Sequence, residues 1–576
     1  MEGVIQCSAN YTPLSPISFL ERAAIVYGDK VSMVYGTEKT SWKQTHQRCI
    51  KLASALVQFF GISPGDTVAA IAPNVPELYE LHFGVPMAGA VLSALNTRID
   101  ATMLAFLLEQ LEAKIIFIYF EFIEVVLEAL NILSDRKGKP PVLQVVLVLI
   151  VESDQITAPS ILLKETPAGC SLEYYNALLA RGRADFEIVP LKNECDPISV
   201  NYTSGSTGIP KGAIYSHRAA YLNSLAAIFR SDMRQMPVFL WTVDMFRCNG
   251  WCFTWAMAAL GGTNIFLRTE LSSKPIFDAI YIHKVTHLCG APTILNIIAD
   301  APATDHQRPL PSRVNITVAG ALPAPQILMK VTELGFNVSH GYGMTEALGP
   351  AAILGPWERR LQYSSKLIMD EQTERIKGRE GLHNLIMDGV DVKDPKTMKS
   401  IPCDGKTIGE VMLKGNAMML GYLKNPKVAQ EAFRDGWYHS GDLAIRHPDG
   451  FVQIKDRAKD IIISSGGEAI STLEVEAVLL SHPKVLNAAV VGRASCDGHL
   501  LGDQAPCAFV KLKKECGVCT AEEIIKFCGD RLPKYMAPHS VVFGDLPVNS
   551  TGKIQKFVLR EKVNIAAGLA LQKGLQ

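Results

Sequence analysis

The sequence has no excess charge of either sign, because 57 lysines and arginines balance 57 aspartates and glutamates among 576 residues. Without a basic surplus there is no electrostatic attraction to nucleic acid or to an anionic membrane surface, so small molecules are the expected partners. Long apolar runs are also missing. The most apolar run, residues 142–151, is about half of the ~20 residues that a membrane span needs. It predicts a buried strand.

Regularly spaced cysteines are absent as well. The 13 cysteines are odd in number and scattered, which indicates reduced thiols inside a cell. Cys516 and Cys519 form a CxxC pair, but no second CxxC or histidine cluster accompanies them, so ordinary thiols are expected. The N-terminus has no signal-peptide pattern, and the C-terminal Lys-Gly-Leu-Gln does not match the Ser-Lys-Leu peroxisomal signal. These features predict a cytoplasmic location, with a peroxisomal one as the alternative.

The chain is longer than one hydrophobic core usually serves, so two or three domains are expected. Apolar runs such as residues 68–72 alternate with helical patterns, which is typical of an α/β fold. Asn74 is expected to cap a helix that starts near Pro76, and Asp100 to cap another. We predict a large α/β body over residues 1–456 and a small α+β domain over residues 457–576.

The segment from Tyr202 to Gly212 has the composition of a phosphate-binding loop. Its glycines allow successive backbone N–H groups to point inward, its hydroxyls can donate to phosphate oxygens, and a lysine adds positive charge. It is not a P-loop, because Pro210 and Gly212 take the places of the Gly and the Ser or Thr of that motif. A strand pattern follows, so the loop is expected to join two strands. The candidate phosphate ligands are Thr203, Ser204, Gly205, Ser206, Thr207, Gly208 and Lys211.

Two small-residue segments follow predicted strands farther along the chain. Gly320 and Ala321 come after the strand at residues 314–318, and the sequence Tyr-Gly-Met-Thr-Glu at residues 342–346 comes after another strand. Strand ends of an α/β sheet form the crevice where ligands bind. Tyr342 can stack on a planar ring that approaches the small residues, and Glu346 offers a hard oxygen ligand for Mg²⁺.

Asp449 and Gly450 lie between two apolar runs and predict a hairpin with a two-residue loop. In that register Asp442 lies opposite Arg457. The pair is either a cross-strand ion pair worth ~0.2–1 kcal/mol or a joint site for a vicinal diol such as ribose. Nearer the C-terminus, Lys553 lies on a glycine-bearing turn where an anion can reach it.

Three of the six tryptophans lie between Trp241 and Trp255. Such a cluster is either a packed core or the wall of an apolar pocket into which Arg247 and Asn249 bring polar groups. Trp251, Cys289 and Met344 are further candidates for the lining of that pocket.

Taken in order, these motifs resemble those of the adenylate-forming superfamily of acyl-CoA synthetases, luciferases and nonribosomal adenylation domains. The resemblance extends over roughly residues 14–560, and residues 95–100, 246–251 and 421–426 resemble the plant-type acyl-activating enzymes, which include ligases for butyrate, benzoate and cinnamate. It implies an ATP-dependent carboxylic acid–CoA ligase of fatty acid metabolism that forms acyl-AMP and then acyl-CoA. ATP, Mg²⁺, CoA and a small aliphatic or aromatic acid are the implied cofactors and substrates.

The resemblance also implies a role for each motif. The loop from Thr203 to Lys211 would hold the β- and γ-phosphates, and Asp442 with Arg457 would hold the ribose. Lys459 would be the hinge about which the small domain rotates. The adenine site would comprise Gly320, Ala321, Tyr342 and Gly343, the Mg²⁺ ligand would be Glu346, and the catalytic residues would be Lys553, Thr345 and Arg247.

The sequence departs from the family pattern at two places near this site. Asp244 and Arg247 stand where relatives have Pro and His, and Arg247 either pairs with Asp244 or binds a second carboxylate on the substrate. Residues 464–469 carry one extra residue and lack the family's Asn, which predicts a slower second step. The alternative to an active ligase is a degenerate paralogue that binds nucleotide or acyl-adenylate without completing turnover.

Overall fold

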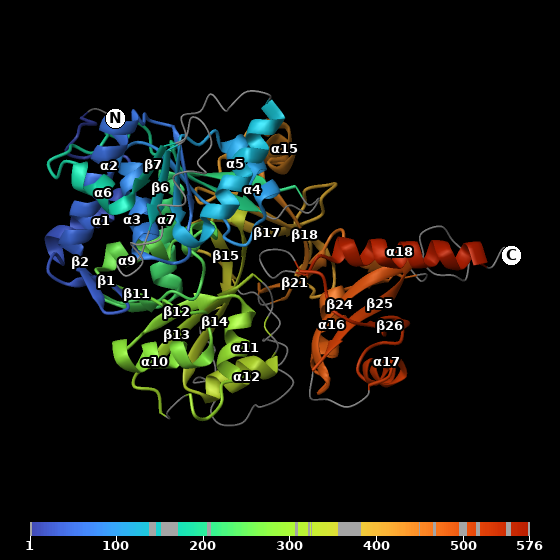
Figure 1. Cartoon of the computed structure of the whole chain (residues 1–576). Coiled ribbons are helices and arrows are strands. Elements are labelled where there is room, and N and C mark those ends of the chain that lie inside the picture. The colour runs from blue at the N-terminus through green and yellow to red at the C-terminus, as the bar shows by residue number, and fades with distance from the viewer. Residues whose placement is uncertain are drawn as a thin grey trace.

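The structure is a computed structural model that describes residues 3–137, 146–150, 171–203, 209–305, 309–320, 323, 325–354, 382–448, 450–464, 468–494, 504–513, 519–548 and 554–573. Two large sheets and a four-stranded sheet form the body, and the last elements form a separate small sheet with its own helices (Figure 1). The α/β class predicted from the sequence is confirmed. The boundary at residue 457 stays a prediction.

One large sheet carries the phosphate-loop candidate. Its strand order is β19-β9-β8-β4-β3-β5-β6-β7. Strands β3 to β8 run parallel, and β9 returns antiparallel to β8. The strands are β3 (Thr67–Ile71), β4 (Val91–Ala94), β5 (Ile115–Tyr119), β6 (Val146–Ile150), β7 (Ser171–Tyr174), β8 (Pro197–Thr203), β9 (Lys211–Ser216) and β19 (Gly421–Tyr422).

The other large sheet has the order β16-β15-β14-β13-β12-β10-β11-β1-β2. Its central strands are parallel, so their carboxyl ends meet at one edge. The strands are β1 (Val31–Tyr35), β2 (Glu38–Ser41), β10 (Val238–Leu240), β11 (Thr263–Phe266), β12 (His287–Gly290), β13 (Val314–Ala319), β14 (Phe336–Met344), β15 (Gly349–Leu354) and β16 (Leu382–His383).

Both faces of each large sheet are covered, which explains the continuous apolar runs of these strands. In β3, Val68 and Ala70 belong to the core between the two sheets, whereas Ala69 and Ile71 belong to the core on the opposite face. The helices of the body are α1 (Ile17–Val26), α2 (Trp42–Phe60), α3 (Pro76–Met87), α4 (Ala101–Leu111), α5 (Ile123–Lys137), α6 (Tyr175–Arg181), α7 (His217–Arg230), α8 (Cys248–Trp251), α9 (Phe253–Leu260), α10 (Ser273–His283), α11 (Pro292–Ala299), α12 (Pro325–Glu333) and α15 (Pro426–Ala432).

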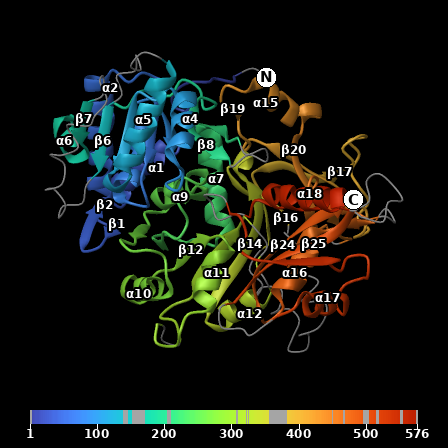
Figure 2. The same cartoon turned by 45° about the vertical axis from the view of Figure 1, so that its right-hand side comes forward.

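The four-stranded sheet leads to the C-terminal elements, which Figure 2 shows in front of it. It consists of β17 (Met387–Lys393), β18 (Gly409–Gly415), β20 (Tyr438–Arg446) and β21 (Val452–Arg457). Two short strands follow, β22 (Ile462–Ile463) and β23 (Ala469–Ile470). The last sheet and its helices are β24 (Val485–Ala494), β25 (Gln504–Leu512), β26 (Ser540–Phe543), α16 (Thr472–Leu480), α17 (Ala521–Gly529) and α18 (Lys556–Lys573).

Two local predictions have different outcomes. Asp100 caps α4 as expected, since its side chain accepts a hydrogen bond from Met103 N at 2.8 Å. Asn74 does not cap α3, because Val75 is the N-cap residue. The Asn74 amide instead donates to Val243 O at 2.8 Å and accepts from Met245 N at 2.9 Å. The Asn74 side chain, which the local pattern predicts to cap a helix, therefore forms tertiary hydrogen bonds instead.

Within the part of the chain that the structure describes, no helix combines the length and apolar character needed to cross a membrane.

Candidate active site

The two ends of the phosphate-loop candidate are held together by strand pairing. Thr203 ends β8 and Lys211 begins β9, and the two residues are register partners in the antiparallel pair. The prediction that the loop joins two strands is confirmed. Lys211 Nζ lies 4.5 Å from the centroid of the Tyr422 ring. The remaining candidates of this loop lie outside the described residues: Ser204, Gly205, Ser206, Thr207 and Gly208.

The second pair of motifs lies at the carboxyl ends of β13 and β14. Gly320 follows β13 with φ +95°, and a Cβ at this position would meet no atom within 4 Å, so the space beside it is open. Ala321 lies outside the described residues. Tyr342 and Gly343 are not in a turn as predicted, because β14 continues to Met344. The strand is buried up to Gly341 and partly exposed from Tyr342 onward.

Gly343 is required by the close approach of β15. A Cβ on Gly343 would lie 2.1 Å from the Gly349 carbonyl oxygen, so any larger residue would push the two strands apart. The register of β14 and β15 also shifts between Tyr342 and Gly343. This irregularity interrupts the regular pairing at the end of β14.

Asp442 joins the end of β14 to the hairpin of β20 and β21. Tyr342 OH donates to Asp442 Oδ2 at 2.6 Å, and Arg457 Nε lies 2.7 Å from Asp442 Oδ1. The Asp442 side chain is 6% exposed and that of Arg457 41% exposed. Burial and the Asp442 carboxylate raise the pKa of Tyr342 well above its usual value. The predicted cross-strand pair is thus present, and a tyrosine donor is added to it.

The pairing of Asp442 with Arg457 was predicted correctly, although the predicted loop length and the register next to the loop were wrong. Arg446 pairs with Val452, and His447 N donates to Phe451 O at 2.9 Å, so the loop is longer than two residues. A bulge between Leu443 and Ala444 then shifts the register by one residue. The bulge and the longer loop compensate, and Asp442 faces Arg457.

Glu346 lies in the short 3-10 helix over residues Thr345–Ala347. Its Oε1 accepts a hydrogen bond from Tyr422 OH at 2.7 Å, and Tyr422 is the residue whose ring lies under Lys211. Thr345 contributes its carbonyl oxygen, which accepts from Tyr215 OH at 2.6 Å. The candidate metal ligand is therefore linked through one tyrosine to the candidate phosphate lysine.

Arg247 is held by a carboxylate. Its Nε lies 3.0 Å from Asp244 Oδ2, and Arg98 Nη1 approaches the same oxygen at 3.1 Å. Of the two alternatives for Arg247, the structure supports the pair with Asp244. Arg98 was not predicted from the sequence, because nothing local links residues 146 positions apart.

The residues after Arg247 form a left-handed turn. Every residue from Cys248 to Cys252 has a positive φ, between 46° and 67°. The Asn249 side chain holds this turn against β8: its Oδ1 accepts from Ser199 Oγ and from Asn201 Nδ2, each at 2.7 Å. Asn249 N also donates to Asn201 Oδ1 at 3.0 Å. Non-glycine residues avoid this conformation, so the strain must be balanced by such contacts.

Lys459 follows β21 at the start of the C-terminal elements. Burial lowers its pKa, and the positive charges of Arg457, Arg560 and Lys211 lower it further. The hinge candidate therefore lies within electrostatic range of both the ribose and the phosphate candidates. Lys553, the remaining catalytic candidate, lies outside the described residues.

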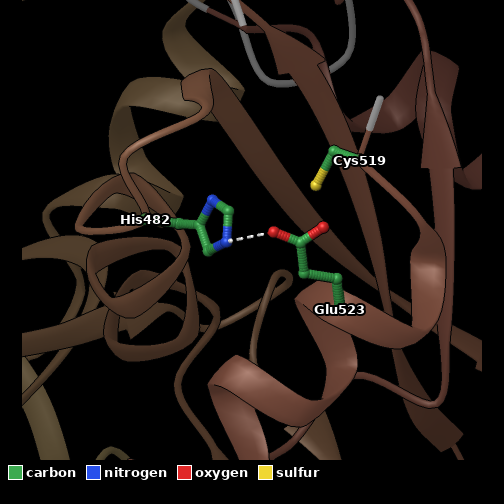
Figure 3. Close-up of side chains that lie close together, drawn as sticks. All are labelled: His482, Cys519 and Glu523. Atoms are coloured by element: carbon green, nitrogen blue, oxygen red, sulfur yellow. Dashed lines mark ion pairs between the residues drawn. The ribbon is translucent and has the colours of Figure 1, made fainter. Parts of the chain in front are cut away.

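A second group of reactive side chains lies in the C-terminal elements, away from this site. His482, Cys519 and Glu523 have ligand-type atoms within 4.8 Å of one another (Figure 3). No local sequence pattern links a histidine to Cys519. The Glu523 carboxylate is already neutralised, since Lys484 Nζ lies 3.0 Å from Oε1 and 3.2 Å from Oε2. His482 Nδ1 accepts from Lys484 N at 3.3 Å, which leaves the ring proton on Nε2, the atom that faces Glu523. These contacts describe a hydrogen-bonded ion pair rather than a vacant metal site.

Comparison with known proteins identifies the family of the chain. The model of the AMP-binding enzyme family matches residues 20–423, and the model of the C-terminal domain of AMP-binding enzymes matches residues 474–553. An acetate–CoA ligase from Humulus lupulus is 46% identical and aligns over 96% of this chain and 95% of its own length. A peroxisomal butyrate–CoA ligase from Arabidopsis thaliana is 44% identical, with 97% and 95% covered.

Solved structures share the fold. A crystal structure of an anthranilate CoA ligase with anthranoyl-AMP has a TM-score of 0.78 at 20% identity and covers 98% of this chain and 100% of its own. A benzoate CoA ligase from Burkholderia xenovorans has a TM-score of 0.76 at 23% identity, with 95% and 99% covered. The chain therefore belongs to the AMP-binding enzymes, the adenylate-forming superfamily that includes the plant acyl-activating enzymes, and by membership is an acid–thiol ligase of the AMP-forming class.

Proposed function

We propose that this chain activates a small carboxylic acid with ATP and transfers the acyl group to coenzyme A. The observation that carries the proposal is the meeting of Tyr342, Asp442 and Arg457 beside Glu346 and Lys211. An acidic acceptor for hydroxyls, an aromatic ring, a cation and a hard oxygen ligand are the groups that a magnesium nucleotide needs. The relatives in the sequence comparison act on acetate, butyrate and benzoate, which supports a small acid.

In the first step a carboxylate oxygen of the acid attacks the α-phosphorus of ATP, and pyrophosphate leaves. Lys211 would neutralise the β- and γ-phosphates, Asp442 would accept hydrogen bonds from the ribose hydroxyls, and Arg457 would hold Asp442 in place. Glu346 would hold Mg²⁺, which supplies charge neutralisation at the phosphates. The open space beside Gly320 is consistent with a planar base lying there.

In the second step the thiol of coenzyme A attacks the acyl carbon, and AMP leaves. We assign the change between the two steps to rotation about Lys459, which would withdraw Lys553 from the adenylate. On the acid side, Asp244 and Arg98 hold Arg247 in a charged cluster. The compartment stays open between the cytosol and the peroxisome, since the Arabidopsis butyrate and benzoate ligases are peroxisomal.

The test is mass spectrometry of the purified chain with ATP, Mg²⁺ and a panel of aliphatic, benzoic, cinnamic and dicarboxylic acids, with and without coenzyme A. Acyl-CoA formation with one group of acids would establish the ligase and its substrate class. Acyl-AMP alone would support a degenerate second step, with Arg247 and residues 464–469 as the responsible features. No product from any acid would refute the proposal and leave a nucleotide-binding paralogue.

A further inference from the structure

Arg230 is the last residue of α7 and differs from the other arginines near the site in its partners. Its Nη2 donates to the Trp251 carbonyl oxygen at 3.0 Å, and its guanidinium carbon lies 5.6 Å from the centroid of the Phe253 ring. The donors on Nε and Nη1 are buried and have no hydrogen-bond partner in the described part of the chain. Two N–H groups of the Arg230 guanidinium are thus buried without the hydrogen-bond acceptors that they need.

Three other arginines illustrate the usual arrangement. Arg247 faces Asp244, Arg457 faces Asp442, and Arg48 faces Glu80. Burial lowers the pKa of Arg230 to about 10, and only the thiols of Cys252, Cys289 and Cys248 act in the opposite direction. A buried cation without an anionic partner is energetically unfavourable. Binding of an anion beside Arg230 would therefore be stabilising.

Arg230 lies close to residues that are expected to contact the acid substrate. Trp251, whose carbonyl it contacts, lies in the left-handed turn from Cys248 to Cys252 that follows Arg247. Cys289 lies in β12, next to β13, whose end carries Gly320. Trp251 and Cys289 are the side chains that the sequence suggested for the lining of the acid pocket. The guanidinium therefore lies next to the residues expected to line the acyl pocket.

We propose that Arg230 binds a second anionic group on the acid, so that the preferred substrates of this ligase are small dicarboxylic acids. The proposal rests on the proposed function above. The planar guanidinium fits a carboxylate, and the ion pair would give its unused N–H groups their partners. Arg247, the other candidate for this role, already has a carboxylate partner in Asp244, which it shares with Arg98.

The experiment compares acids that differ only in the second carboxylate: glutarate against pentanoate, and phthalate against benzoate. The full-length wild-type chain is expected to favour the diacid of a pair by roughly tenfold to a hundredfold in kcat/KM, the range for a charged hydrogen bond. Arg230→Leu should lose that preference and use the monoacid at least as well as the wild type. Arg230→Lys should keep part of the preference. Arg234→Leu is the matched control, because Arg234 is exposed four residues farther along.

A wild-type enzyme that converts only monoacids would overturn the inference and leave the ligase function intact. The same holds if Arg230→Leu lowers kcat/KM equally for both acids of a pair, which would indicate a structural role. If no acid is turned over, the thermal shift decides: stabilisation by glutarate that pentanoate does not produce, and that Arg230→Leu abolishes, would support the inference. Equal shifts in both proteins would overturn it.

Discussion

At the scale of single residues, Asp442 is the group on which the nucleotide site depends. It accepts from Tyr342 OH at 2.6 Å and pairs with Arg457 at 2.7 Å, so it connects the end of β14 to the β20–β21 hairpin. Its backbone N–H is held as well, by Ser440 Oγ at 3.0 Å. The carboxylate is therefore fixed in orientation before any ligand binds, which is the condition for selective binding of hydroxyls.

Asp442→Asn tests this role. The amide keeps the size of the side chain but loses the negative charge, and hydrogen bonds to charged groups are worth about 1.5–3 kcal/mol. We expect the KM for ATP to rise by roughly tenfold to a hundredfold, with a smaller change in the KM for the acid. Steady-state kinetics with each substrate varied in turn gives this split. Asp435→Asn, at an exposed position of the same segment, should behave as wild type; an unchanged KM for ATP in Asp442→Asn would contradict the assignment.

Sequence reasoning reached the pairing of Asp442 with Arg457 from a two-residue loop, and the pairing holds because the bulge between Leu443 and Ala444 offsets the longer loop. It missed the tyrosine donor, Arg98 and the environment of Arg230, since these contacts join residues far apart in the chain. The Asn74 prediction was wrong for the same reason: the amide can cap a helix or bridge to the segment around Val243, and tertiary packing selected the bridge. The local sequence pattern identifies candidate residues, whereas contacts between distant parts of the chain determine what each residue does.

At the scale of elements, the left-handed turn from Cys248 to Cys252 links the two halves of the site. Asn249 binds Ser199 and Asn201 on β8, the strand that ends at Thr203, and the turn begins next to Arg247. Ser199, Asn201 and Thr203 alternate along the strand and so share one face. Any shift of the turn is thereby transmitted to the strand that enters the phosphate loop.

Asn249→Ala should destabilise the chain by about 2–4 kcal/mol, because it removes the two hydrogen bonds accepted by the Asn249 side chain and leaves their buried donors on β8 unsatisfied. It should also raise the KM for ATP. Denaturant unfolding and steady-state kinetics measure the two effects. Asn296→Ala, on the exposed side of α11, is the control and should change stability by only a few tenths of a kcal/mol. Wild-type stability in Asn249→Ala would mean that the turn does not depend on this side chain.

Helix α3 supplies a pH-dependent element. Burial, and then the neighbouring Glu80, raise the pKa of Glu77 from 4.5 to about 7, with Arg48 acting in the opposite direction and Glu38 adding a smaller repulsion. The folded chain therefore binds the Glu77 proton more tightly than the unfolded chain. The contribution of this proton to the free energy of unfolding is fully present below pH 4.5 and is lost as the pH rises through 7.

Glu77→Gln imitates the protonated form at every pH. We expect the variant to be more stable than wild type at pH 8, by about 1–3 kcal/mol, and similar to wild type at pH 4. Thermal unfolding between these two pH values tests the prediction, and Glu124→Gln, at an exposed position on α5, is the control. Parallel pH profiles for wild type and Glu77→Gln would show that Glu77 titrates normally.

At the scale of the whole molecule, the C-terminal elements meet the body close to the candidate nucleotide site. Burial lowers the pKa of Lys459, and the positive charges of Arg457, Arg560 and Lys211 around it lower that pKa further. Asp460 pairs with Arg560 and Asp442 pairs with Arg457, so two of these cations are neutralised. The remaining positive charge stabilises an arrangement in which anionic phosphates lie nearby. This stabilisation becomes weaker once pyrophosphate has left. Charge therefore provides a reason for the C-terminal elements to move between the two steps.

Lys459→Pro tests whether that movement is needed. Proline fixes φ near −65° and removes the backbone N–H, so rotation about this residue would be blocked. We expect acyl-AMP to form at a rate within about tenfold of wild type, and acyl-CoA formation to fall by roughly a hundredfold or more, since only the second step requires the new orientation. Quenched-flow mass spectrometry of both products measures the two steps separately. Lys459→Ala removes the same charge without restricting φ and should preserve both steps. If Lys459→Pro transferred the acyl group at the rate of Lys459→Ala, the rotation axis would lie elsewhere in the chain, and the charge at residue 459 would act only on the phosphates.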